Sequence, residues 1–343
     1  MMSPIPVGVL LDQHLAEVER SHRDGLAAGL DAAGLDRPYE LVVAQTDALP
    51  AGTSKSLREG FERLRDAGVV AIVGPAVTDN CLLSRVLADR AELPLLNWSG
   101  HEQTRSRYSF HYQVGSLEEE PALIVDRLVA QGRTHVALVF DRSEIGASYL
   151  RWFERRAQPA GVTVAGRAGI SPTTQDTTKE VQELRATGVD TLVYLGLGHS
   201  AVAVASALRA GGWQPQVFTN TALMYGHMHP ERRPMWEGWV YVDMYADDNL
   251  VLRELRERDP QPWQDNPIGI CSYDMGRLLG EALRLAPHLN PDGVLEGLQQ
   301  VKQVPAAAGH GGTTMTFGSW DRAALKGDYL VSRVWRGGRS EQA

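Results

Sequence analysis

Short apolar runs alternate with amphipathic helical stretches along most of the chain, and this alternation constrains the fold more than any other feature. Runs such as VVAIV (69–73) and TLVYLG (191–196) are almost continuously apolar, which is typical of parallel strands covered by helices on both faces. The stretches between them are long enough for crossover helices. The pattern therefore predicts an α/β fold. Predicted strands occupy residues 7–11, 40–45, 69–73, 93–97, 135–140, 162–165, 191–196, 217–220 and 239–244, and predicted helices occupy residues 18–33, 54–66, 80–91, 118–131, 147–158, 177–187 and 201–210.

The alternation restarts in the middle of the chain, which predicts two doubly wound lobes. One set of strand–helix units ends near residue 117, and a second runs from 134 to 244. The segments VGSLEEEP (114–121) and YADDN (245–249) are candidate hinge crossovers. A long helix is predicted over 269–286, followed by β-like segments at 314–317 and 328–335.

Composition narrows the classes of function. With 343 residues, 22% charged residues and a net charge of −8, the chain lacks the basic surface of a nucleic-acid or anionic-membrane binder. Its apolar runs are shorter than the ~20 residues of a membrane span. Cys81 and Cys271 lack zinc-ligand spacing, and we expect two buried thiols rather than a disulfide. We expect no metal and no cofactor.

The first residues, MMSPIPV (1–7), have no basic segment followed by an apolar one. A secretory signal has both features. The sequence as it stands therefore predicts a cytoplasmic protein, or an extracytoplasmic one if a signal was removed.

Polar and aromatic loops follow the predicted strands. Ligands of open α/β sheets bind outside the carboxyl ends of the strands, so these loops are candidate binding loops. Their hydroxyls, amides and imidazoles can also serve as turn formers and helix caps; Thr78 or Asp79 would cap a helix that begins near Asn80. Trp98 is either a core residue or a stacking platform. The loops occupy residues 12–14, 74–80, 98–101, 141–146, 197–200 and 219–225.

Two enzyme-like motifs overlap after the strand 191–196. The first, G-x-G-x-x-A at 196–201, resembles a dinucleotide fingerprint, but no acid lies between Asp190 and Glu231 to hold a ribose. The second resembles a nucleophile elbow around Ser200, with Val202 replacing the second glycine. A Ser200-dependent hydrolase therefore remains an alternative. We interpret the histidines of YGHMHPE (225–231) as exposed loop residues rather than metal ligands.

Over about residues 5–336 the chain resembles the type I periplasmic binding proteins of the leucine/isoleucine/valine-binding class. The resemblance implies two Rossmann-like lobes joined by three hinge crossovers, a ligand cleft between the lobes and no catalysis. The lobes would comprise residues 1–117 plus 248–312 and residues 118–247 plus 313–343. The segments that carry the resemblance are VGVLL (7–11), GVVAIVGPAVTD (68–79), ELPLLNWSG (92–100), THVALVFDRSEIGASYLRWFERRAQPAGVTV (134–164), VQELRATGVDTLVYLG (181–196), ALRAGGW (207–213), WEGWVYVDMY (236–245), SYDMGRLLGEAL (272–283) and TTMTFGSWDRAALKGDYLVSRVWRGG (313–338).

The family's ligand site can be carried over position by position. In the family, two first-lobe loops grip the ligand, an aromatic residue and a tyrosine-bearing loop come from the second lobe, an acid holds the ammonium group, and a tyrosine lies near the hinge. The corresponding positions here are Thr78, Asp79 and Asn80, then Ser99, Gly100 and His101, then Ile145, then Gly198 and His199, then Thr221 and Ala222, and finally Tyr273.

Two departures from the family change the expected ligand. Asp79 stands where a ligand carboxylate would be held, and Thr221 and Ala222 replace the acid that would pair with an ammonium group. A buried charge without a partner is costly. We therefore expect an aromatic, amide-bearing or other weakly charged ligand rather than a plain branched-chain amino acid. The residues that suit such a ligand are Trp98, His101, His199, Met224 and Tyr273.

Together these observations predict a non-enzymatic solute-binding protein, monomeric or homodimeric, that closes on a small molecule. Its output would be ABC-type uptake through a permease. An alternative is a cytosolic amide-type sensor that acts through a regulatory protein.

Overall fold

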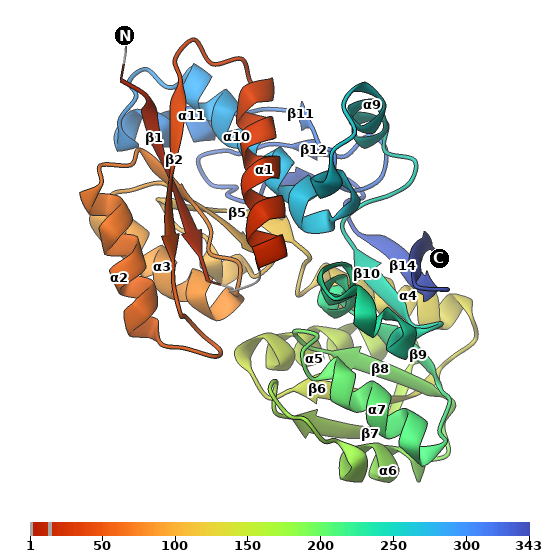
Figure 1. The fold of residues 1–343 in the computed structure, drawn as a ribbon. Helices are drawn as coiled ribbons and strands as arrows, with labels where there is room; N and C mark the ends of the chain where they lie inside the picture. Colours follow the sequence, from red (N-terminus) through yellow and green to blue (C-terminus); the bar gives the residue numbers. More distant parts are fainter. Residues whose placement is uncertain (1–2, 13–15) are drawn as a thin grey trace. The chain divides into compact units, whose positions relative to one another are not determined.

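The computed structural model describes residues 3–12 and 16–343 (Figure 1). The chain divides into two compact units that are each discontinuous in sequence. The first unit comprises Met1–Val114 and Tyr245–Tyr329, and the second comprises Gly115–Met244 and Leu330–Ala343. The chain therefore passes from one unit to the other at residues 114/115, 244/245 and 329/330.

Residues 313–329 belong to the first unit, whereas we expected them in the second. Backbone pairing explains the difference. His111 donates its backbone N–H to Arg322 and accepts one from Ala324, so this segment forms a bridge with the edge of the first unit's sheet. It also contributes two strands to a small antiparallel sheet, whose order is β11-β12-β13. These strands are β11 (Val304–Pro305), β12 (Thr314–Met315) and β13 (Leu325–Lys326).

The first unit is built on a parallel sheet with the order β2-β1-β3-β4-β5. Its central strand β3 is fully buried, as the apolar run in the sequence predicts. Burying each such aliphatic side chain contributes about 1.5–3 kcal/mol. The strands are β1 (Ile5–Leu11), β2 (Tyr39–Gln45), β3 (Ala71–Val73), β4 (Leu95–Ser99) and β5 (Ser109–Val114).

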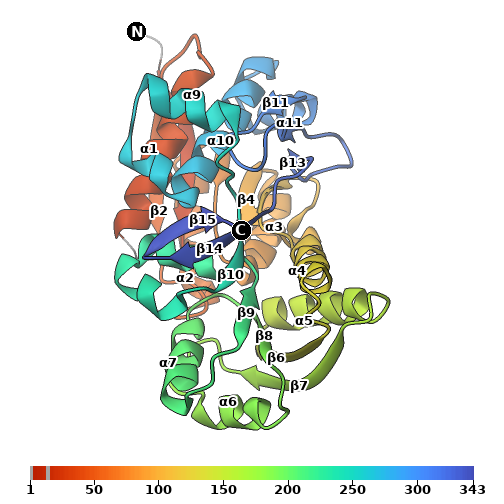
Figure 2. The same ribbon diagram turned by 90° about the vertical axis from the view of Figure 1, so that its right-hand side faces the viewer.

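The second unit has a mixed sheet with the order β15-β14-β10-β9-β8-β6-β7. The pairs from β7 to β10 are parallel, whereas β14 pairs antiparallel with both β10 and β15 (Figure 2). The last residues of the chain thus complete this sheet. The strands are β6 (His135–Asp141), β7 (Thr163–Ile170), β8 (Thr191–Leu195), β9 (Gln216–Thr219), β10 (Val240–Asp243), β14 (Val331–Arg336) and β15 (Arg339–Gln342).

Helices connect the strands, and side-chain caps fix where several of them begin. Thr53 accepts a hydrogen bond from the N–H of Ser56 at the start of α2, and Ser143 and Asn290 cap α5 and α11 in the same way. The helices are α1 (Ala16–Ala32), α2 (Ser54–Asp66), α3 (Thr78–Ala91), α4 (Glu119–Ala130), α5 (Glu144–Ala157), α6 (Thr178–Arg185), α7 (Ala201–Gly211), α8 (Tyr225–Met228), α9 (Leu250–Arg258), α10 (Pro267–Leu285) and α11 (Pro291–Gln300), with 3-10 turns η1 (Glu102–Thr104), η2 (Thr221–Met224), η3 (Pro230–Trp236) and η4 (Pro262–Asp265).

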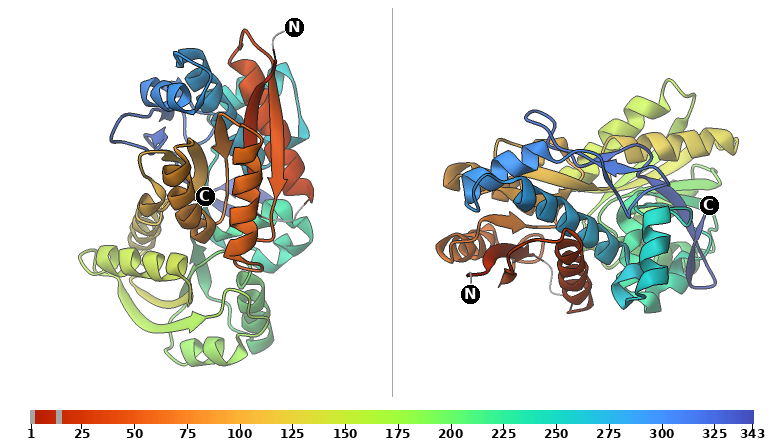
Figure 3. Two further views of the ribbon diagram at one scale, coloured as in Figure 1. Left: turned by 90° about the vertical axis from the view of Figure 1, so that its left-hand side faces the viewer. Right: turned by 90° about the horizontal axis from the view of Figure 1, so that it is seen from above.

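Helices α1 and α10 pack directly against each other in the first unit (Figure 3). Glycines allow the close approach. A Cβ atom on Gly29 would lie 2.1 Å from the carbonyl oxygen of Tyr273, and one on Gly276 would lie 2.3 Å from that of Leu26. Any larger residue at either position would push the two backbones apart.

Several sequence predictions need correction. Strand β5 was not predicted, although its alternating letters SFHYQV are typical of a strand, and helices α9 and α11 were also missed. Cys81 and Cys271 are free and buried, as expected. In the described part of the chain, no helix combines the length and the apolar character needed to cross a membrane.

Candidate functional site

A buried carboxylate organises the loop at the carboxyl end of β3. Asp12 follows β1, and its two oxygens accept hydrogen bonds from the N–H of Ala76 (3.0 Å), the N–H of Val77 (2.9 Å) and the amide of Asn80 (2.8 Å). Burial raises the pKa of Asp12, and these hydrogen bonds offset part of that rise. Because all three partners are donors, the geometry suits the ionised carboxylate.

Asp12 does not cap α3, because the N–H groups from which it accepts hydrogen bonds, those of Ala76 and Val77, precede the first helical residue. Helix α3 begins at Thr78 rather than near Asn80, and its N-cap residue is Val77, which has no side-chain cap. Gly74, with φ of +105°, makes the turn into this loop, where a Cβ atom would lie 2.2 Å from the carbonyl oxygen of Leu10. The loop is therefore held in part by Asp12, which follows the neighbouring strand β1, and in part by the amide of Asn80.

The next loop of the first unit is tied to this one by hydroxyl groups. The side chains of Thr78 and Ser99 share a hydrogen bond of 3.0 Å, and Ser99 Oγ also accepts from the N–H of His101. The structure thus brings Thr78, Ser99 and His101 together. Gly100 lies between them and is partly exposed.

Two of the predicted aromatic site residues, Trp98 and Tyr273, each pack against another ring of the first unit. Trp98, at the end of β4, is 5% exposed, and its ring centroid lies 4.9 Å from that of His22 on α1. Tyr273, on α10, stacks on Trp263 with centroids 5.5 Å apart. Burial lowers the pKa of His22 to about 4, so this imidazole is neutral at physiological pH. Sequence reasoning missed His22 because its partners Trp98 and Ser272 are distant in sequence.

The second unit repeats the carboxylate arrangement. Asp141 ends β6 and accepts hydrogen bonds from the N–H of Leu197 (2.8 Å) and the hydroxyl of Ser200 (2.6 Å), with the hydroxyl of Tyr194 3.4 Å away. Burial raises its pKa, and these hydrogen bonds partly offset the rise. A Cβ atom on Gly196 would lie 2.3 Å from an oxygen of Asp141. The glycine of the apparent dinucleotide motif thus makes room for a carboxylate of this chain.

A third carboxylate lies beside the loop that follows β9. Glu120, near the start of α4, is fully buried, and it accepts hydrogen bonds from the N–H of Thr221 (2.6 Å), the N–H of Ser116 (2.7 Å) and the hydroxyl of Tyr149 (2.7 Å). Burial raises the pKa of Glu120 to about 7. An acid therefore lies next to Thr221, but it comes from another element, which the sequence could not indicate.

Other predicted site residues are less accessible. Ile145 lies in the hydrophobic core of the second unit, which contradicts its place in a ligand site. Asn80 is fully buried, and its amide holds Asp12 and Leu49, so we assign it a scaffold role. The remaining positions divide by burial. Ala222, Met224 and Gly198 are buried, Asp79 and Thr221 are partly exposed, and His199 is exposed. Residues 13 and 14 of the first predicted loop lie outside the described residues.

The serine and histidines of the enzyme-like and metal-like motifs form hydrogen bonds with other side chains of this chain. Ser200 is fully buried and bonds to Asp141 and, at 2.7 Å, to the hydroxyl of Tyr194. His227 is buried and bonds to Asp243, so our interpretation of it as an exposed histidine is wrong. The side chain of His229 contacts Glu231. In the described ranges, no group of three or more His, Cys, Asp or Glu side chains is placed to hold a metal ion.

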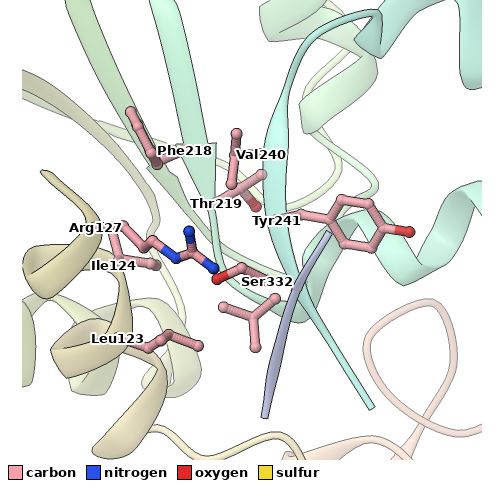
Figure 4. A pocket seen from close by; sticks show the side chains of 9 residues that line it. Leu123, Ile124, Arg127, Phe218, Thr219, Val240, Tyr241 and Ser332 are labelled. Carbon is pink, nitrogen blue, oxygen red and sulfur yellow. The ribbon is translucent and has the colours of Figure 1, made fainter. Parts of the chain in front are cut away.

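A small cavity in the second unit lies between α4 and the sheet (Figure 4). Its volume of about 10 Å³ accommodates about one water molecule. Arg127 extends across it toward Ser332. The cavity is therefore too small for an organic ligand. Its lining residues are Leu123, Ile124, Arg127, Phe218, Thr219, Val240, Tyr241, Val242 and Ser332.

The fold matches that of known solute-binding proteins. A leucine-binding protein from Thermotoga maritima has 14% identity and a TM-score of 0.84, over 99% of this chain and 97% of that chain. An ABC transporter substrate-binding protein from Desulfitobacterium hafniense, solved in complex with Leu, has 17% identity and a TM-score of 0.82, over 99% of this chain and all of that chain. At these identities the likeness shows the fold alone.

A further solved structure, an extracellular ligand-binding receptor from Rhodopseudomonas palustris, has 14% identity and a TM-score of 0.80, over 99% of this chain and 100% of that chain. A search of curated proteins finds no match. The family described as "Periplasmic binding protein", whose proteins bind small molecules and are not enzymes, matches residues 4–334. The chain, with its type I fold, therefore belongs to the periplasmic binding protein family.

Proposed function

We propose that this protein binds a small, weakly charged organic solute without chemical conversion and serves ABC-type uptake or ligand sensing. Family membership supports solute binding. The solute would contact the polar and aromatic groups at the carboxyl ends of the strands in each sheet, including Ser99, His101 and His199.

The observation that carries the ligand assignment is that a carboxylate of this chain already binds the loop before α3 and the loop before α7. Asp12 occupies the N–H groups of Ala76 and Val77 just before α3, and Asp141 occupies that of Leu197 just before α7. A second anion next to either carboxylate would meet like-charge repulsion. These loops therefore disfavour the carboxylate of a free amino acid.

An ammonium group also lacks a suitable partner near Thr221. Both oxygens of the nearby Glu120 accept hydrogen bonds from this chain, and the side chain is fully buried. A cation would have to displace those bonds and lose its own hydration, which is costly. A zwitterionic branched-chain amino acid would thus find neither a favourable site for its carboxylate nor a partner for its ammonium group.

A thermal-shift screen followed by calorimetric titration tests the proposal. The panel contains branched-chain amino acids, aromatic metabolites and primary amides. We expect stabilisation by at least one aromatic or amide-bearing compound and none by leucine, isoleucine or valine at equal concentration. Tight binding of a plain branched-chain amino acid would refute the ligand assignment while leaving solute binding intact.

Uptake and sensing differ in partner and compartment. If the protein delivers solute, affinity capture from intact cells recovers a permease, and fractionation places the protein outside the cytoplasm. If it senses solute, capture recovers a regulatory protein from the cytoplasm in a solute-dependent manner. The two outcomes choose between the branches of the proposal.

A further inference from the structure

An aromatic and cationic cluster lies at the carboxyl ends of β8 and β9 in the second unit, and we call it the Arg232 cluster. It consists of His199, which follows β8, and of Tyr225, His229 and Arg232, which follow β9 on α8 and η3. The ring centroids of His199 and Tyr225 lie 4.9 Å apart, and those of Tyr225 and His229 lie 4.1 Å apart. Tyr225 is thus the centre of the cluster.

Tyr225 fixes the position of the guanidinium group of Arg232. The Nη1 atom of Arg232 donates to the hydroxyl of Tyr225 at 3.0 Å, and its Cζ lies 5.3 Å from the ring centroid. About a third of the side chain, 35%, remains exposed. An arginine that is held in place and still reaches solvent is prepared to bind a planar anion, because less conformational freedom is lost on binding.

The charges around the cluster leave it positive. Glu231 lies 3.5 Å from Nε of Arg232, but its side chain is 64% exposed. A pair so open to water is weak. Arg233 lies next in sequence and adds a second positive charge, with its guanidinium over Trp335. The ring of Tyr225 shields the imidazole of His199 from water on one side, and this partial desolvation, together with the charges of His229 and Arg232, lowers the pKa of His199; the imidazole is therefore neutral and able to donate a hydrogen bond.

From this geometry we infer that the Arg232 cluster binds the carboxylate of a solute that lacks an ammonium group. The inference rests on the proposed function and narrows it to singly charged organic acids. Asp12 and Asp141 already occupy the loop N–H groups before α3 and α7, whereas Arg232 offers a partly exposed cation. The ring of Tyr225 and the imidazole of His199 flank the bound carboxylate.

Compounds that share a carbon skeleton but differ in charge show whether the protein recognises the carboxylate or the ammonium group of the solute. Three carbon skeletons, 4-methylpentanoyl, 3-phenylpropanoyl and 4-hydroxyphenylacetyl, are each tested as the acid, the primary amide and the corresponding α-amino acid. For the skeleton that binds most tightly, we expect the acid to bind about tenfold or more tightly than its amide, since a hydrogen bond to a charged group is involved. The α-amino acid should bind no better than the amide.

Variants then locate the effect. Arg232→Gln should reduce the affinity of the acid to that of the amide and leave the amide's affinity unchanged, and Arg232→Lys should give an intermediate value. Arg155→Gln is the control, because Arg155 is an exposed arginine of the same unit on α5 that lies over Trp152, outside the Arg232 cluster. It should alter neither affinity. Circular dichroism melts show whether each variant is folded.

The outcomes distinguish this inference from the proposed function. Preference for an amide or an α-amino acid, or an equal loss of acid and amide binding in Arg232→Gln, overturns the inference and leaves solute binding standing. If no compound of any class binds, both the inference and the proposed ligand class are rejected.

Discussion

Each unit places a buried carboxylate beside a loop that follows a strand, but different groups donate hydrogen bonds to the two carboxylates. In each, a buried carboxylate stands at the end of the strand next to a candidate binding loop: Asp12 after β1, which lies beside β3, and Asp141 on β6, which lies beside β8. Asp12 is bound by two backbone N–H groups and one amide. Asp141 is bound by one backbone N–H and by the hydroxyls of Ser200 and Tyr194.

The difference determines what each loop tolerates. Backbone N–H groups can only donate, so Asp12 must supply acceptors on both oxygens. Hydroxyl groups can donate or accept, so the surroundings of Asp141 can reverse the direction of a hydrogen bond. We therefore expect the first unit's loop to require the charged carboxylate strictly, and the second unit's loop to accept a neutral isostere.

The largest expected effect is that of Asp12→Asn. The amide nitrogen of the new side chain would face a backbone N–H or the amide of Asn80, which leaves at least one buried donor without an acceptor. We expect a loss of about 2–4 kcal/mol in the free energy of unfolding, measured by urea denaturation. Faster hydrogen exchange at the amides of residues 74–80 would localise the loss. A variant as stable as the wild type would contradict the donor-only description.

Glu120 extends the comparison to pH, because it also accepts two backbone N–H groups but has a pKa raised to about 7 by burial. The folded protein then holds this proton more tightly than the unfolded chain, whose glutamate has its ordinary pKa near 4.5. The stability from Glu120 is fully present below pH 4.5 and is lost as the pH rises through 7. We expect this loss to be about 2 kcal/mol between pH 5 and pH 7.

Urea melts of the wild type and Glu120→Gln at pH 5, 6 and 7 measure this contribution. The difference in the free energy of unfolding between the two proteins should shift in favour of the variant as the pH rises. Other buried carboxylates titrate equally in both proteins and cancel in the difference. Parallel pH profiles would show that Glu120 does not titrate in this range.

A smaller effect is expected for Ser200→Ala. The change removes a 2.6 Å hydrogen bond to Asp141, while Tyr194 and Leu197 remain to donate. We expect a loss of about 1–2 kcal/mol in the free energy of unfolding. Assays with generic esters should show the same background rate for variant and wild type. Activity that disappears with Ser200 would revive the hydrolase alternative.

The smallest effect should be that of Asp141→Asn. Its oxygen can accept from Leu197, and its amide can donate to the hydroxyls of Ser200 and Tyr194. We expect a loss below about 1 kcal/mol, well under that of Asp12→Asn in the same urea series. Equal losses for the two asparagine variants would remove the distinction between the units.

The fold could be predicted from the sequence because its signals are local. Continuous apolar runs such as β3 and β8 are buried strands, and a polar capping residue such as Thr53 marks where its helix begins. The alternating pattern of β5 was present but was overlooked, since His111 and Gln113 interrupt its apolar letters. The place of residues 313–329 depended on backbone pairing with His111, which no local pattern encodes.

The candidate site was less predictable because its contacts join distant residues. The hydrogen bond between Asp12 and Val77 spans 65 positions, and that between Glu120 and Thr221 spans 101. Local rules therefore assigned the cap of α3 to Thr78 or Asp79, and they saw a missing acid near Thr221. The Arg232 cluster was missed for a similar reason, since Tyr225 and Arg232 acquire meaning only beside His199.

The discontinuous units have a consequence for synthesis on the ribosome. Helix α1 forms early, yet the α10 backbone against which its glycines pack is made some 250 positions later. The sheet of the second unit likewise lacks β14 and β15 until the last residues emerge. Because domains fold as units during translation, the first unit cannot finish before α10 is made, and the second cannot finish before β14 and β15 are made. We expect nascent chains to expose apolar surface for most of their elongation and to depend on chaperones during that time.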